Sequence, residues 1–137
     1  MRKFLIATHG QLASGLKSAL DLIIGEQEGV FTLNAYANGN ESIGKALDEL
    51  LLNVQEGEEL LVFTDIMAGS ITNQVIQRTA HLPHVHTVSG VNLALLIELV
   101  LSDQAEPIVD TIERAVEQAK KQVVYVDKMI NKEEDND

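Results

Sequence analysis

The chain of 137 residues contains no cysteine, only two prolines and no long uninterrupted apolar run. The absence of cysteine excludes disulfides, thiolate nucleophiles and thiolate-bound zinc, and it fits a reducing compartment. Even the apolar stretch 91–101 is interrupted by Asn92 and Glu98, and the apolar run before His9 is too short for the core of a signal peptide. We therefore expect a cytoplasmic protein without a membrane span.

Positive charge is also scarce, with ten basic side chains against 21 acidic ones and a formal net charge of −11. Such a surface repels the phosphate backbone of nucleic acids and anionic membranes, so neither is an expected partner. The length and the 45% hydrophobic content predict one domain with a substantial core. We expect this domain to span residues 1–128 and to be followed by a charged, frayed tail at 129–137.

Short β-like runs alternate with longer segments of helical periodicity, which is typical of βαβ units and a mainly parallel sheet. The chain is therefore predicted to be an α/β three-layer sandwich in which helices flank a central sheet of strand order 2-1-3-4. The predicted strands are 3–8, 30–36, 60–64, 84–89 and a last short one at 122–126. The predicted helices are 12–23, 43–54, 70–80, 92–101 and 106–121.

Two of the predicted helices allow more detailed expectations. The first helix should bury an apolar stripe and should end at Gly25. The second should be capped by Asn40 or Ser42. The expected stripe of the first helix consists of Leu12, Leu16, Ala19, Leu20 and Ile23.

The candidate site lies at the carboxyl ends of the strands, where ligands gather in open α/β sheets. The three loops of interest are 8–11, 65–70 and 89–92. If the strand order is 2-1-3-4, the first and third strands are neighbours, and His9 lies beside Asp65. A histidine held by a carboxylate at one ring nitrogen presents the other as an oriented nucleophile, which suits phosphoryl transfer.

No lysine or arginine occurs in 10–16 or 65–77 to neutralise a phosphoryl group. Backbone N–H groups at the starts of the first and third helices are the expected substitute, with Gly10 and Gly69 allowing close approach and Ser70 adding a hydroxyl. Each residue alone has a simpler interpretation as a strand-end histidine, a cap or a turn residue. Their joint placement at adjacent strand ends favours the functional interpretation.

Three segments also resemble the IIA components of the mannose, fructose and sorbose family of sugar phosphotransferase systems. Residues 4–10, FLIATHG, are similar to the family's opening strand and its phosphorylatable histidine. Residues 65–73, DIMAGSITN, resemble the loop D-x-x-G-G-S-P-x-N, except that Ala68 and Ile71 replace glycine and proline. Residues 90–98, GVNLALLIE, resemble G-V-N-x-x-x-L-x-E.

The resemblance implies that His9 is phosphorylated on the ring nitrogen facing away from Asp65, its orienting partner. Gly10, Gly69, Ser70 and the nearby backbone would line the phosphoryl site. The implied donor is phospho-HPr, the acceptor is a IIB component, and a membrane IIC/IID complex is served indirectly. No cofactor is implied.

Several alternatives compete with this prediction. A Ser-His-Asp hydrolase could use Ser70, His9 and Asp65, although the G-x-S-x-G elbow is missing. His81, His84 and His86 could suggest a metal site, but no carboxylate lies close to them in the sequence. A nucleotide or flavin binder lacks its glycine motifs. A phosphorylatable regulatory module and a phosphotransfer subunit of the dihydroxyacetone-kinase type remain further alternatives.

The segment 122–126 is apolar and β-branched, and as an exposed edge strand it would promote aggregation. We expect it to be paired in a symmetric homodimer, as the resemblance also implies. The alternative is that this strand completes the sheet of its own chain.

Overall fold

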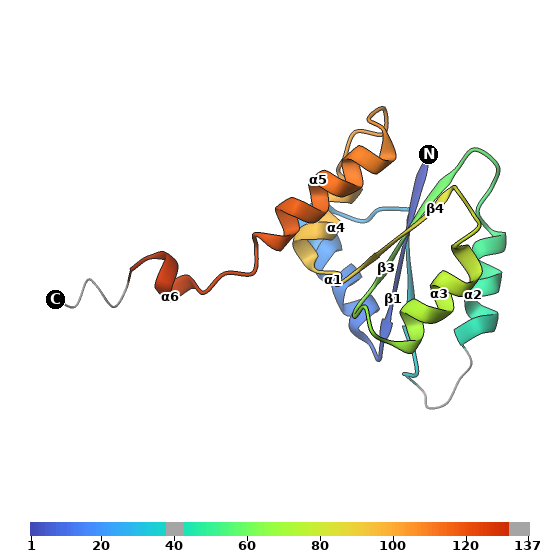
Figure 1. Ribbon diagram of the computed structural model, residues 1–137, viewed down its shortest axis with the longest axis horizontal. Coiled ribbons are helices and arrows are strands. Elements are labelled where there is room, and N and C mark those ends of the chain that lie inside the picture. Colours follow the sequence, from blue (N-terminus) through green and yellow to red (C-terminus); the bar gives the residue numbers. More distant parts are fainter. Residues whose placement is uncertain (38–42, 132–137) are drawn as a thin grey trace.

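The computed structural model describes residues 1–37 and 43–131 (Figure 1). The strands in these ranges are β1 (Arg2–His9), β2 (Val30–Ala35), β3 (Glu59–Thr64) and β4 (Val85–Ser89). The helices are α1 (Leu12–Ile24), α2 (Ile43–Leu52), α3 (Ser70–Thr79), α4 (Leu93–Val100), α5 (Ile108–Lys120) and α6 (Val126–Met129).

The strands form one sheet of order β2-β1-β3-β4 in which every pairing is parallel. Helices α1, α4 and α5 lie on one side of this sheet, and α2 and α3 lie on the other (Figure 1). The predicted three-layer α/β sandwich and its strand order are therefore confirmed. Because all four strands run the same way, the loops that follow them meet at one edge of the sheet.

Each face of the sheet has its own apolar core, which explains the unbroken apolar runs 4–7 in β1 and 60–63 in β3. On β1, Phe4 and Ile6 point into the core beneath α1, α4 and α5, whereas Leu5 and Ala7 point into the core beneath α2 and α3. Phe63 on β3 is fully buried and stacks with Phe4 at a centroid distance of 6.3 Å. Burial of one such side chain contributes roughly 1.5–3 kcal/mol to the stability of the sheet that carries the site.

The ends of the helices agree closely with their sequence signals. Gly25 follows α1 with φ +83°, and the Asn92 side chain caps α4 by accepting a hydrogen bond from the Leu95 N–H at 2.8 Å. The predicted caps of α2, Asn40 and Ser42, lie outside the described residues.

The predicted buried stripe of α1 is partly wrong. Leu12 and Ile23 are 47% and 57% exposed, whereas Ala13 and Leu20 are buried and Leu16 packs against them. The stripe that faces the core consists of Ala13, Leu16, Leu20 and Ile24, so its first and last members each lie one residue later than predicted. Since α1 is apolar around much of its circumference, its periodicity alone did not determine which face turns inward.

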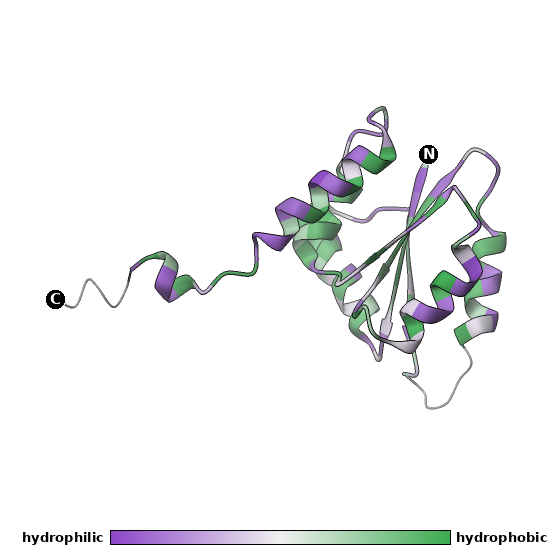
Figure 2. Ribbon diagram, in the orientation of Figure 1, coloured by the Kyte–Doolittle hydropathy of each residue, from purple (hydrophilic) through white to green (hydrophobic). Residues whose placement is uncertain are grey.

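The predicted strand at 122–126 is not formed within this chain. Residues 122–125 belong to no strand of the described sheet, and Val126 already begins α6. The segment leads away from the domain and carries apolar side chains, with Val123 83% and Tyr125 66% exposed (Figures 1 and 2). A strand requires a hydrogen-bonding neighbour, and the part of the chain that the structure describes places none beside this segment. The alternative that the segment completes its own sheet is therefore wrong, and pairing with a second copy stays a prediction.

None of the helices within 1–37 and 43–131 combines the length and the apolar character that crossing a bilayer requires. Residues 132–137, most of the predicted charged tail, lie outside the described ranges.

Candidate functional site

His9 and Asp65 lie side by side at the carboxyl edge of the sheet. His9 is the last residue of β1, and Asp65 directly follows the neighbouring strand β3. The Nδ1 atom of His9 lies 2.8 Å from Oδ2 of Asp65, and the His9 backbone N–H donates to the same oxygen at 2.9 Å. The His9 side chain is 43% exposed, whereas that of Asp65 is only 13% exposed. The predicted strand order thus brings the two side chains into contact and leaves His9 accessible.

The surroundings of Asp65 favour its ionised form. Burial alone would raise the pKa of this carboxyl, but the hydrogen bonds from the backbone N–H and ring of His9 outweigh it, and the pKa is lowered. The second oxygen, Oδ1, accepts a hydrogen bond from the Ile66 N–H at 3.0 Å. Because an ionised carboxylate can only accept, Nδ1 of His9 carries the proton in this pair. In the neutral ring the lone pair is then on Nε2, for which the described residues provide no hydrogen-bond partner.

The two predicted site glycines are required for different reasons. Gly10 has φ +58°, and its N–H donates to the Ala35 carbonyl at 2.8 Å. A Cβ at Gly10 would contact no protein atom within 4 Å, so the turn with its positive φ accounts for glycine here, and close approach to a phosphoryl group stays a prediction. Gly69 has extended backbone with φ −157°, but its Cβ would lie 3.2 Å from Cγ1 of Ile66 and 3.7 Å from Cε1 of His9. Close packing against Ile66 and the His9 ring therefore accounts for glycine at this position, and close approach to a phosphoryl group stays a prediction.

Helix α3 begins at Ser70, beside the His9 ring. The residue before it, Gly69, has no side chain with which to cap the helix. Of the other helices that begin at this edge, α4 is capped by Asn92, and the Ser14 N–H of α1 donates a hydrogen bond to the Asn34 side chain. The residues just before α2 lie outside the described ranges. The N-terminus of α3 therefore presents partial positive charge that no cap in the described ranges neutralises.

Tyr36 is a residue of this edge that the sequence reasoning missed. Its hydroxyl lies 3.1 Å from Oγ of Ser70, and its ring centroid lies 5.9 Å from that of His9. The predicted second strand ended at this tyrosine, and in the order 2-1-3-4 its carboxyl end lies next to that of the first strand. The signal was present, but only the loops after the other three strands were considered.

The two departures from the family loop are accommodated. Ala68 is not among the residues with positive φ, as its Cβ requires. Ile71 is fully buried in the core beneath α2 and α3. Its burial stabilises the first turn of α3, which proline would stabilise through its fixed φ angle. The third predicted loop, 89–92, contacts the strand that precedes Asp65. The Val91 N–H donates a hydrogen bond at 3.0 Å to the carbonyl of Thr64, the residue before Asp65.

The described contacts form neither the serine-hydrolase relay nor the histidine metal site that the sequence left as alternatives. The recorded partner of Ser70 Oγ is Tyr36 and not His9, so the relay of a serine hydrolase is not formed. Nε2 of His86 lies 3.9 Å from Oε1 of Glu59, a carboxylate that the sequence spacing did not reveal. Residues 1–37 and 43–131 contain no group of three or more His, Asp or Glu side chains arranged to hold a metal ion.

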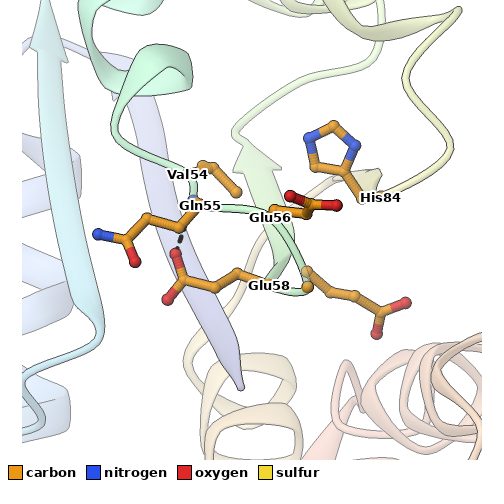
Figure 3. A pocket seen from close by; sticks show the side chains of 7 residues that line it. Val54, Gln55, Glu56, Glu58 and His84 are labelled. Carbon is orange, nitrogen blue, oxygen red and sulfur yellow. Dashed lines mark hydrogen bonds between the residues drawn. The ribbon is translucent and has the colours of Figure 1, made fainter.

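A hollow of about 430 Å³ opens at the opposite, amino-terminal edge of the sheet (Figure 3). Glu56, Glu58 and Glu59 line it together with His84. The Glu58 carboxylate accepts a hydrogen bond from the Gln55 N–H at 2.8 Å and pairs with Lys3 at 3.1 Å. This acidic hollow is unsuited to a phosphoryl group and is separated from His9 by the length of the strands.

This parallel α/β sandwich carries at its carboxyl edge an exposed histidine held by a carboxylate, and such a histidine presents an oriented ring nitrogen. The model of the family EIIA-man, described as PTS system fructose IIA component, matches residues 3–127. The chain belongs to this family of sugar phosphotransferase system IIA components.

Individual relatives agree with the family. The chain is 27% identical to the sorbose-specific EIIA component of Klebsiella pneumoniae over 70% of each chain. It is 26% identical to the mannose-specific EIIAB component of Escherichia coli K12 over 78% of this chain and spans only 33% of that longer protein.

Solved structures show the same fold. A protein provisionally described as a phosphotransferase system permease from Klebsiella pneumoniae is 34% identical, with a TM-score of 0.88 and coverage of 94% and 93% of the two chains. The EIIA component of Streptococcus agalactiae is 28% identical, with a TM-score of 0.81 and coverage of 93% and 99%.

Proposed function

We propose that this chain is a cytoplasmic phosphocarrier that accepts a phosphoryl group from phospho-HPr on Nε2 of His9. It passes the group to a IIB component, which serves the sugar-transporting IIC/IID complex of the membrane. The observation that carries this proposal is the 2.8 Å contact between Nδ1 of His9 and Oδ2 of Asp65, which leaves Nε2 as the exposed nucleophile. Membership of the IIA family supports the same chemistry.

The transfer requires no reactant beyond the two proteins. The lone pair of His9 Nε2 forms a bond to phosphorus while the N–P bond of the donor breaks, and its electron pair returns to the donor nitrogen. The proton stays on Nδ1, so the His9 ring acquires positive charge as the new bond forms. The ionised carboxylate of Asp65, in contact with Nδ1, stabilises that charge and holds the ring in line. In the second transfer the bond between His9 Nε2 and phosphorus breaks as a nucleophile of IIB bonds to phosphorus, and the electron pair returns to Nε2.

The phosphoryl oxygens need neutral hydrogen-bond donors, because 10–16 and 65–77 contain no lysine or arginine. The uncapped start of α3 offers backbone N–H groups and the Ser70 hydroxyl next to the His9 ring. Gly69 leaves room there because it lacks a Cβ. Weak compensation of charge suits a carrier, since a tightly stabilised phosphohistidine would not pass its phosphoryl group onward.

The surface around His9 suits contact with partner proteins. Ile66 and Met67 are 53% and 67% exposed in the loop that follows Asp65. Apolar side chains beside a reactive group are typical of the centre of a docking surface. We expect phospho-HPr and IIB to dock on this surface in turn, since each must reach His9.

The proposed carrier acts as a homodimer. The exposed apolar segment 122–130 leads away from its own domain, and isolated apolar surface of this kind is stabilised by association (Figure 2). A closed twofold arrangement would cover both copies of the segment.

Incubation with enzyme I, HPr and phosphoenolpyruvate, followed by candidate IIB proteins, tests the proposed function. We expect phosphorylation that depends on HPr and passes onward to at least one IIB protein. Phosphorylation without transfer to any IIB would instead indicate a regulatory module. Phosphorylation by a dihydroxyacetone-kinase system only would indicate that type of subunit.

A further inference from the structure

Tyr36 has an unusual backbone conformation for an aromatic residue. It directly follows β2 with φ +62°, in the left-handed region that a bulky side chain adopts at a cost of roughly 1–2 kcal/mol. Such conformations persist where the surroundings hold them, and they concentrate at functional sites. Tyr36 is 36% exposed, so burial in the core does not account for it.

The contacts of Tyr36 reach across the top of β1. In the sheet, β1 separates β2 from β3, and α3 follows β3. The 3.1 Å hydrogen bond between the hydroxyls of Tyr36 and Ser70 therefore crosses the carboxyl end of β1, where His9 lies. The Tyr36 ring also borders the His9 ring, with centroids 5.9 Å apart and planes inclined by 35°. Tyr36 and Ser70 thus enclose His9 from two elements that are not adjacent in the sheet.

Either hydroxyl of this pair can donate, and the difference in their acidity favours Tyr36 as the donor. A phenol is a stronger hydrogen-bond donor than the alkyl hydroxyl of serine. The Tyr36 O–H then donates to Ser70 Oγ, and the Ser70 proton remains available for a further acceptor. Donation into Ser70 polarises its own O–H and strengthens the bond that it makes in turn.

We propose that Tyr36 is a positioning residue of the phosphoryl site and acts through Ser70. Its hydroxyl orients the Ser70 hydroxyl toward a phosphoryl oxygen on His9 Nε2, in a site whose loops lack a cation. This inference rests on the proposed function and adds to it a residue that the family motifs do not include. The backbone strain at Tyr36 is the cost of bringing a phenol to this position.

The test compares Tyr36→Phe, Ser70→Ala and the double variant. Phenylalanine keeps the ring beside His9 and removes only the hydroxyl. Ser18→Ala, at an exposed serine on α1, is the matched control for loss of a serine hydroxyl. Urea midpoints and circular dichroism establish that each variant is folded. The main measurement is the equilibrium constant for phosphoryl exchange with HPr, and the second is the ³¹P chemical shift of phospho-His9.

We expect Ser70→Ala to shift the equilibrium toward phospho-HPr about tenfold, as loss of a hydrogen bond to a charged group does. Tyr36→Phe should shift it roughly threefold through the weakened Ser70 bond. The double variant should match Ser70→Ala alone within a factor of about two, because the Tyr36 effect passes through Ser70. Both single changes should shift the ³¹P resonance of phospho-His9. Ser18→Ala should change neither this resonance nor the equilibrium constant for exchange with HPr.

An unchanged equilibrium in either single variant would overturn the inference. So would a double variant whose shift is the product of the two single shifts, because Tyr36 would then act without Ser70. These outcomes require a wild-type protein that accepts phosphoryl from phospho-HPr. A wild type that accepts none would overturn the proposed function itself, together with this inference.

Discussion

A single oxygen of Asp65 holds His9 at two points. Oδ2 accepts hydrogen bonds from the His9 backbone N–H at 2.9 Å and from the ring Nδ1 at 2.8 Å. The backbone bond fixes the end of β1 relative to β3, and the ring bond fixes the direction of the imidazole. The orientation of Nε2 therefore follows directly from the pairing of the two strands.

Asp65→Asn should retain the fold but slow phosphoryl transfer. An asparagine oxygen can still accept from Nδ1, but it lacks the negative charge that stabilises the ring as phosphorus bonds to Nε2. We expect a barrier higher by about 1–3 kcal/mol. Single-turnover transfer from phospho-HPr measures this, and Asp110→Asn, at an exposed position of α5, is the control. An unchanged rate would show that Asp65 is structural.

The lowered pKa of Asp65 predicts how acid affects stability. A depressed folded-state pKa contributes stability above the unfolded value of about 4, and this contribution is lost as pH falls through the folded value. The wild type should therefore exceed Asp65→Asn in unfolding free energy near neutral pH, and the difference should narrow as the pH falls below about 4. Urea unfolding of both proteins across this range checks it. A difference independent of pH would contradict the assignment.

Much of the fold could be predicted from two patterns in the sequence. Burial on both faces makes β1 and β3 apolar, and each strand is followed by a segment with helical periodicity. The predicted strand order, in which the first and third strands are neighbours, then placed His9 beside Asp65. The inward face of α1 was harder, since Leu12 and Ala13 both fit a helical stripe. The segment 122–126 has strand composition but finds no partner strand among residues 1–37 and 43–131, which sequence periodicity does not reveal.

Within the site, the sequence indicated the residue types but not every physical role. The reasons for Gly10 and Gly69 differ, a backbone angle in one and a neighbouring side chain in the other, and only coordinates separate them. Tyr36 was missed because the loop after the second strand was left out, although the strand order places its start beside His9.

Gly10→Ala and Gly69→Ala should therefore have different effects. A Cβ at Gly10 meets open space but must adopt φ +58°, so we expect a loss of roughly 1–2 kcal/mol in unfolding free energy. A Cβ at Gly69 has permitted backbone angles but crowds Ile66 and approaches His9, so transfer should slow while stability changes less. Urea unfolding and single-turnover transfer on both variants separate the effects. The reverse pattern would contradict this account of the two glycines.

Removal of the residues after Lys121 should abolish the proposed dimer. The exposed side chains Val123, Val124 and Tyr125 would be lost, together with the apolar surface of α6. Light scattering at micromolar concentration should show a dimer for the full chain and a folded monomer for the shortened one. A full-length monomer, or a shortened chain that stays dimeric, would exclude this segment as the contact.

The most direct test of the account is intact-mass spectrometry after incubation with enzyme I, HPr and phosphoenolpyruvate. The chain has four histidines, and His81→Ala provides a control away from the site. We predict that the wild type and His81→Ala each gain one acid-labile phosphoryl group and that His9→Ala gains none. Phosphorylation that persists in folded His9→Ala, or a wild type that is never phosphorylated, would contradict the assignment of His9 as the carrier.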